Sequence, residues 1–396
     1  MTKNKLEIYL HIPFCVKKCL YCDFLSAPGS EETIERYVRA LCAEIREAAL
    51  SGVSVLKRPV SSIFIGGGTP SLLSGVQIKA LMDIVKECFV LAEDAEITME
   101  VNPGTVDLEK LSAYRSTGIN RLSIGLQSAN DEELKRLGRI HGFSDFLSTY
   151  ENARRAGFSN INVDIMSALP GQTYESYQTT LQRVISLSPP PEHISAYSLI
   201  VEEETPFSAL FHEGKLDLPD EDTERLMYEK TEALLREKGY VRYEISNYAR
   251  EGFACRHNCG YWERTDYLGF GIGAASLLEN MRFQNGRDLQ AYLNNPSGCR
   301  QEEHLLSKEE QMEEFLFLGL RMMQGISPAE FYLQFAVPIE EIYGSVIAKN
   351  IADGLLCYLP AEEKDAAPGK EPAKRLVLTK RGIDVSNYVM AQFLLT

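Results

Sequence analysis

The sequence has no uninterrupted apolar run that approaches the roughly 20 residues of a membrane-spanning helix. Hydrophobic residues make up 44% of the chain and charged residues 24%, which is ordinary for a soluble globular protein. We therefore do not expect a membrane-embedded protein. The first ten residues, MTKNKLEIYL, lack the apolar segment and the small-residue cleavage site of a secretory signal. A cytoplasmic location is the resulting expectation.

Positive charge is scarce. The chain has 41 lysines and arginines against 56 aspartates and glutamates, and its formal net charge is −15. Proteins that follow a nucleic-acid backbone gain affinity by neutralising phosphates with clustered basic side chains. We therefore expect no nucleic-acid partner.

A disulfide framework is also absent from the pattern, because nine cysteines are an odd number scattered over 396 residues. Clustered cysteines in such a chain indicate metal binding or catalysis instead. Four cysteines stand alone and are expected to be small buried or surface residues: Cys42, Cys88, Cys299 and Cys357.

Short runs rich in β-branched and aromatic residues alternate with longer amphipathic segments. The runs predict strands at 6–13, 61–68, 95–103, 120–128, 160–170 and 193–201. The segments predict helices that include 32–50, 75–89, 176–187 and an acidic one at 222–239. Strand and helix in alternation predict an α/β fold with parallel strands and right-handed crossovers. Six units fit a partial (β/α)6 barrel of the TIM type.

The pattern changes after about residue 250, where a loop-rich segment begins. A helical pattern follows at 306–323, then two strands at 353–360 and 375–382 and an amphipathic segment at 385–395. The polar stretch 360–374 between the two strands predicts a mobile loop. We expect a barrel domain over 1–250 and a smaller helical, winged-helix-like domain over 251–396.

Unusual residues gather where the predicted strands end. Three cysteines follow the first strand, three glycines end the second, and Glu100, Gln127 and Asp164 lie on the third, fourth and fifth. The carboxyl ends of the strands of such a barrel share one rim, and that rim carries the chemistry of the fold. The sequence therefore predicts one site built from distant segments.

The cysteines Cys15, Cys19 and Cys22 have the spacing C-x-x-x-C-x-x-C. A structural zinc site is usually closed by four protein ligands, and the nearest fourth candidates here are Asp23 and His11. A four-iron cluster normally takes four thiolates, so three thiolates would leave one iron open for another ligand. Both interpretations stand on the spacing alone.

The segment FIGGGTPS contains Gly66 to Gly68, which let the backbone approach a ligand where a Cβ would clash. A tight turn is the simpler explanation, since no P-loop lysine follows. Glu100 interrupts an apolar strand, and a buried carboxylate needs a hydrogen-bonding or charged partner. A pair of ribose hydroxyls or an ammonium group would provide one.

The cysteine spacing, its place after the first strand and the aromatic Tyr21 resemble the radical S-adenosylmethionine (SAM) superfamily. The resemblance implies a 4Fe-4S cluster on Cys15, Cys19 and Cys22, with the amino and carboxylate groups of SAM on the open iron. It also implies that the following residues bind SAM: Tyr9, Tyr21, Gly67, Gly68, Thr69, Glu100, Gln127, Arg139 and Asp164. Taken singly, Gln127, Arg139 and Asp164 are ordinary residues, which a capping glutamine, a solvated arginine and a hydrogen-bonded core aspartate would explain.

Over nearly the whole chain the motifs YLHIPFC, GGGTPS, EVNPG and VDIMSALPGQT resemble the oxygen-independent coproporphyrinogen III oxidase group, which includes HemW-type heme chaperones. The dehydrogenases of that group carry a further cysteine where this chain has Phe24, and they have a longer N-terminal arm. The segment HNCGYW matches the H-N-x-x-Y-W motif of the chaperones, so the resemblance implies that His257 contributes to heme binding. Cys255 and Cys259 are alternative ligands. Many relatives have a histidine where Ala275 stands here, so a role of that histidine cannot be transferred.

The sequence thus predicts a heme chaperone that holds heme as cargo for an apo-hemoprotein, with a 4Fe-4S cluster and SAM as cofactors. An electron donor and a peripheral membrane contact through a partner belong to this hypothesis. The alternative is the enzyme coproporphyrinogen III dehydrogenase, and a structural zinc module is the third possibility.

Overall fold

The fold is described from a computed structural model, which describes residues 5–50, 53–360 and 374–395. The loop predicted over 360–374 lies outside the described residues, except for its first and last residue, which belong to strands.

Six parallel strands form the centre of the molecule, as predicted. They pair in sequence order, and neighbouring strands are joined by helical crossovers. Nearly every residue of the first, fourth and fifth of these strands is buried, as expected when the outer face carries helices. Their bounds are β1 (Leu6–Ile12), β2 (Val60–Gly67), β3 (Leu91–Val101), β4 (Arg121–Gln127), β5 (Ile161–Ser167) and β6 (His193–Ser198). The partial (β/α)6 barrel is confirmed.

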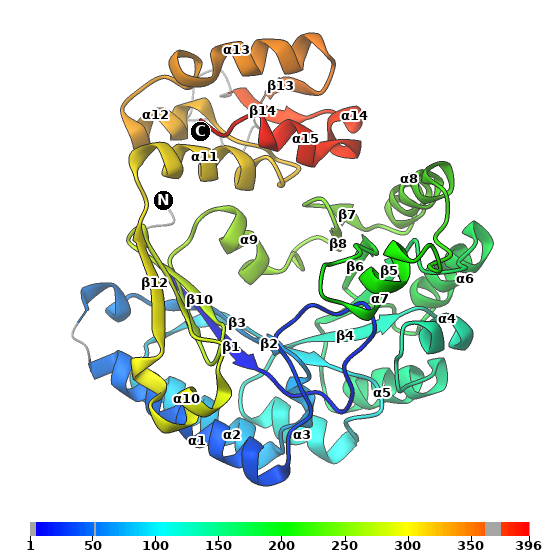
Figure 1. Cartoon of the computed structure of the whole chain (residues 1–396), viewed down its shortest axis with the longest axis vertical. Coiled ribbons are helices and arrows are strands. Elements are labelled where there is room, and N and C mark those ends of the chain that lie inside the picture. The colour runs from blue at the N-terminus through cyan, green and yellow to red at the C-terminus, as the bar shows by residue number, and fades with distance from the viewer. Residues whose placement is uncertain (1–4, 51–52, 361–373, 396) are drawn as a thin grey trace.

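The crossover helices cover the outer face of these strands (Figure 1). Capping residues set their starts: Ser74 and Gln77 form a capping box before one helix, and Thr173 caps another. The crossover helices are α1 (Glu31–Leu50), α2 (Gly75–Cys88), α3 (Leu108–Ser116), α4 (Asp131–Arg136), α5 (Phe143–Arg155) and α6 (Tyr174–Ile185), and α7 (Pro206–His212) and α8 (Glu221–Glu237) follow β6.

The sheet extends at both edges beyond the six predicted strands. β8 (Asn247–Ala249) pairs antiparallel with β6, and β7 (Val241–Arg242) pairs with β8. On the other side, a strand from residues 267–270 pairs parallel with β1 and starts an antiparallel group. This group and its helices are α9 (Arg256–Trp262), β9 (Tyr267–Phe270), β10 (Ala275–Leu278), β11 (Met281–Asn285), α10 (Leu289–Asn294) and β12 (Arg300–Leu305).

The boundary predicted at residue 250 differs from this arrangement. β9 to β12 belong to the same sheet as the barrel, and Leu268, Phe270 and Phe283 lie in the barrel's hydrophobic core. The strands escaped sequence prediction because they are short, at four to six residues each. β12, with the sequence RQEEHL, is exposed throughout and has no alternating apolar face.

A second hydrophobic core begins with Met312 and continues to Phe393. Helices and one hairpin surround it, in the order expected of a winged-helix-like unit, and Figure 1 shows them as a separate layer, coloured yellow to red. The elements are α11 (Lys308–Gly319), α12 (Pro328–Phe335), α13 (Ile339–Ala352), β13 (Leu356–Pro360), β14 (Lys374–Leu378), α14 (Lys380–Asp384) and α15 (Ser386–Ala391). Within the described residues, no helix is both long and apolar enough to cross a membrane.

Ion pairs join the C-terminal layer to the sheet. Glu314 of α11 accepts from Arg264 Nε at 2.8 Å and from Arg282 Nη2 of β11 at 2.6 Å. The side chains of Glu314 and Arg264 are only 11% and 6% exposed, so both charges are largely removed from water. Glu314 is the carboxylate that pairs with both guanidinium groups.

We expect Glu314→Ala to lower the free energy of unfolding by about 2 kcal/mol, because it leaves two guanidinium groups without their shared partner. Urea unfolding followed by circular dichroism measures the change. Glu309→Ala, an exposed residue of the same helix, serves as the control and should cost less than about 1 kcal/mol. Equal losses for the two variants would contradict the structural importance of this ion pair.

Candidate functional site

One cavity at the carboxyl ends of the barrel strands collects the residues that the sequence predicted. Its volume is about 410 Å³. All of the predicted cluster, SAM and heme residues line it: Tyr9, Cys15, Cys19, Tyr21, Cys22, Gly67, Gly68, Thr69, Glu100, Gln127, Arg139, Asp164 and His257. Their convergence follows from parallel pairing, because each strand delivers its last residues to the same rim.

The cysteine loop follows β1 directly and is held by the neighbouring loops. Thr69 Oγ1 donates to Cys15 Sγ at 3.4 Å, and Arg139 Nη1 donates to Cys19 Sγ at 3.7 Å. Burial raises the pKa of the Cys22 thiol to about 11. Two of the three sulfur atoms thus have a donor that would stabilise a thiolate.

Among the residues that the structure describes, no three His, Cys, Asp or Glu side chains converge as ligands of one metal ion. His11 has other partners, since its Nε2 lies 2.9 Å from the Leu25 carbonyl oxygen and its Nδ1 lies 3.0 Å from the Tyr9 hydroxyl. The three thiols line the cavity.

The glycine loop after β2 lies against the start of the cysteine loop. Gly68 N donates to Ile12 O at 2.8 Å, and Thr69 N donates to Phe14 O at 2.7 Å. A Cβ on Gly68 would lie 2.7 Å from Phe14 O and 3.0 Å from Ile12 O, so only glycine fits. Gly67 has a φ of 113°, which also favours glycine. The close approach of the two loops places Thr69 beside Cys15.

Glu100 and Asp164 are the two carboxylic acids among the described residues that line the cavity. Glu100 Oε2 accepts from Gly67 N at 3.0 Å, and burial, followed by the neighbouring Asp164, raises the pKa of Glu100 to about 8. Burial also raises the pKa of Asp164, which accepts from Ser123 Oγ at 3.0 Å. Two carboxyl groups with raised pKa values in one cavity favour a ligand that brings positive charge or hydroxyl donors.

Arg139 and Gln127 are fixed by residues that sequence reasoning missed. Asn102 Oδ1 accepts from Arg139 Nη2 at 2.9 Å, while its Nδ2 donates to Thr69 Oγ1 at 2.9 Å. Tyr197 donates its hydroxyl to Gln127 Oε1 at 3.0 Å. Asn102 had a usable signal, because it stands two positions after Glu100 in a strand-end motif. Tyr197, in the apolar run of β6, had none.

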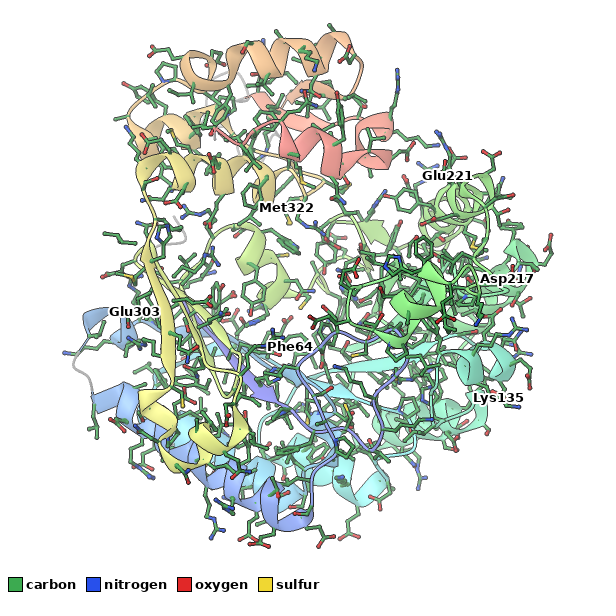
Figure 2. All side chains as sticks on the ribbon, viewed as in Figure 1. Phe64, Lys135, Asp217, Glu221, Glu303 and Met322 are labelled. Atoms are coloured by element: carbon green, nitrogen blue, oxygen red, sulfur yellow. The ribbon has the colours of Figure 1, made fainter. Side chains whose placement is uncertain are left out.

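His257 lies on the short helix α9 and not in a loop, and it is almost completely buried at 1% exposure. Its Nδ1 is hydrogen-bonded to Ser62 Oγ at 2.8 Å and its Nε2 to the Tyr261 hydroxyl at 3.0 Å. The ring stacks on Phe64, which Figure 2 labels on β2. Burial, followed by nearby Arg121, lowers its pKa to about 3, so the imidazole is neutral near pH 7.

The two cysteines beside His257 lie away from the cavity. Cys255 is fully buried, its Sγ donates to Glu96 Oε1 at 3.4 Å, and burial raises its pKa. Burial also raises the pKa of Cys259 to about 12. Neither residue is among those lining the cavity. As alternative heme or metal ligands, both thiols would have to ionise in surroundings that oppose ionisation.

Comparison with known families defines the class of this protein. Residues 9–184 match the family model of the radical SAM superfamily, and residues 306–358 match that of the HemN C-terminal domain. The chain is similar to a solved structure of coproporphyrinogen III oxidase (HemN) from Escherichia coli, with a TM-score of 0.82 and 24% sequence identity. The match covers 100% of this chain and 91% of the HemN chain. That likeness confirms the radical SAM fold with its C-terminal domain.

Two relatives narrow the class to a family. The heme chaperone HemW of Lactococcus lactis is 35% identical over 396 residues, which cover 100% of this chain and 99% of the relative. The heme chaperone HemW of Escherichia coli is 38% identical over 358 residues, which cover 89% and 91%. The chain belongs to the HemW family of the radical SAM superfamily. Membership of that superfamily implies a 4Fe-4S cluster and SAM as cofactors.

We expect Glu100→Gln to change how stability depends on pH. The carboxyl group of the folded protein stays protonated up to about pH 8, whereas in the unfolded chain it ionises near pH 4.3. Between those values the folded state holds the extra proton, so stability falls as the pH rises. The amide does not titrate, and the variant should gain on the wild type by about 2 kcal/mol between about pH 5.5 and 7.5.

Urea unfolding at the two pH values tests this expectation. Glu109→Gln, at an exposed position of α3, removes a carboxyl group outside the cavity and serves as the control. A Glu100→Gln variant with the same pH dependence as wild type would show that Glu100 ionises normally.

Proposed function

We propose that this protein is a heme chaperone, which binds heme and delivers it to an apo-hemoprotein. The observation that carries the proposal is identity of 35% to 38% with heme chaperones HemW over nearly the full length of both chains. Such coverage includes both the barrel and the C-terminal layer, so it is not limited to a cofactor domain.

The cluster in this proposal is held by Cys15, Cys19 and Cys22. The donor set fits such a group, because all three thiols line the cavity and two of them accept from Thr69 and Arg139. A three-thiolate cluster supplies an open iron for the SAM headgroup and electrons for reductive chemistry. The electron donor is a further part of the proposal.

SAM in this proposal lies along the rim of the barrel. Gly67 and Gly68 offer backbone without a Cβ, and Glu100 and Asp164 offer carboxyl groups for its ammonium group and ribose hydroxyls. The other proposed contacts are Tyr9, Tyr21, Thr69, Gln127 and Arg139. The positive charge of SAM matches a site whose two carboxyl groups have raised pKa values, because an opposite charge favours their ionised form.

Helix α9 contributes the heme-binding motif in this proposal. His257 has both ring nitrogens engaged, and one of them holds the Tyr261 hydroxyl at 3.0 Å. We therefore assign His257 a positioning role: its hydrogen bond holds the ring of Tyr261, which is followed by Trp262 at the end of α9. Direct ligation of iron by His257 would have to replace one of these hydrogen bonds.

One sequence feature supports a chaperone over the dehydrogenase. Phe24 stands where the enzymes have a further cysteine, and its side chain is 60% exposed beside the cluster loop. A cytoplasmic location and contact with a membrane through a partner complete the proposal.

Cys19→Ser is expected to abolish the cluster, because two thiolates cannot hold it in place of three. Iron and acid-labile sulfide are measured after anaerobic reconstitution, together with the visible absorbance. Cys42→Ser changes an isolated cysteine of α1 and should retain full iron and sulfide. Equal content in the two variants would refute the ligand assignment.

Heme binding is expected to be saturable and to be weakened by His257→Ala, since the substitution releases Tyr261 from its hydrogen bond. Anaerobic titration of the reconstituted protein, followed in the Soret region, measures the affinity. His212→Ala, an exposed histidine of α7, is the control and should bind as wild type does. Formation of protoporphyrinogen from coproporphyrinogen III under reducing conditions with SAM would instead establish the dehydrogenase.

A further inference from the structure

A second cavity of about 740 Å³ adjoins the one described above. It lies between the antiparallel strands β9 to β11, helix α9 and helix α11 of the C-terminal layer. Tyr9, Phe24 and Tyr261 line both cavities, so the two share a boundary. Its volume falls in the range of about 300 to 1,000 Å³ that small-molecule sites occupy.

Aromatic and aliphatic side chains from both layers form its walls. Trp262 comes from α9, Leu277 from β10, and Phe317 and Leu318 from α11. Phe24 adds an exposed ring from the cluster loop. Aromatic faces on two sides of a gap are suited to a flat apolar ring, which buries large area against them.

Of the two arginines that line this cavity, one is ion-paired and the other has no ion pair among the described residues. Arg282 is bound to Glu314 at 2.6 Å and donates to the Tyr267 hydroxyl at 3.3 Å. Arg287 is exposed, lines the cavity and makes no ion pair with any residue of the described chain. Asp23, the other acid on the lining besides Glu314, comes from the cluster loop. Arg287 is thus the guanidinium that remains available to a ligand carboxylate.

The first cavity is less suited to a macrocycle. It is smaller, at about 410 Å³, and it is lined by the residues proposed for the cluster and SAM. The second cavity places a ring beside that site, with only Tyr9, Phe24 and Tyr261 between them. A ligand in the second cavity would leave the first one free for its cofactors.

We infer that the second cavity is the heme-binding site. The ring would lie between α9, α11 and strands β9–β11, with a propionate carboxylate on Arg287. This inference rests on the proposed function, because it names the place where the cargo of that function is held. Ala275 is exposed on β10 and lines this cavity, so a larger side chain at this position would occupy the space proposed for the ring.

The test is a Soret titration with ferric heme, carried out anaerobically on the full chain with its cluster. Arg287→Glu should weaken heme binding by about tenfold or more, because a carboxylate would then face the propionate. Ala275→Trp should weaken it at least as much by occupying the cavity. The matched controls change an exposed residue of α1, as Arg39→Glu and Arg39→Trp, and should bind as wild type does.

Folding is checked by circular dichroism and by iron and sulfide content, which Arg287→Glu should leave unchanged since the side chain is exposed. Wild-type affinity in both cavity variants, with saturable binding by wild type, would overturn the inference and leave the chaperone function standing. Absence of saturable binding in wild type would overturn the proposed function and this inference together. Tenfold weakening in both variants, with unchanged controls, would support the assignment.

Discussion

Two backbone hydrogen bonds between neighbouring loops are the constraint on which the rest of the site depends. They run from Gly68 N to Ile12 O and from Thr69 N to Phe14 O, and they continue the β1–β2 ladder past the ends of both strands. Because the loops touch at this distance, Gly68 has no room for a side chain. Thr69 is thereby brought to Cys15, and the cysteine loop starts from a fixed position on the rim.

Burial of polar groups is the second physical theme of the molecule. Glu100, Asp164 and His257 all have pKa values shifted toward their neutral forms, because desolvation opposes charge. Arg139 is instead held by Asn102 and by the Gly125 carbonyl oxygen, at 2.9 and 2.8 Å. The cavity is therefore preorganised, with carboxyl groups that ionise readily only when a ligand brings compensating charge or donors.

Much of the barrel could be predicted from sequence because its strands are continuous apolar runs separated by capped helices. The predicted strand at 120–128 corresponds to β4 at Arg121–Gln127, which is buried along its whole length. The strands of residues 267–305 could not be predicted in the same way, since each has only four to six residues and the last of them is polar and exposed. They join the sheet through hydrogen bonds of β9 to β1, a partner about 260 positions earlier in the chain. Helix α9 was likewise not predicted, because its seven residues are too few to show a helical period.

The sequence by itself determined which side chains reach the rim, because parallel strands that alternate with helices deliver their last residues to one edge. Cys15, Glu100 and Asp164 could be placed in one site for that reason. The tertiary structure decided how those groups are paired and which cavities exist. Asn102 between Thr69 and Arg139, and the second cavity beneath α11, arise from contacts between segments distant in the chain. A local sequence pattern predicts whether a residue lies in a strand or a helix. Its hydrogen-bond partners and the walls of the cavities depend on how separate layers pack.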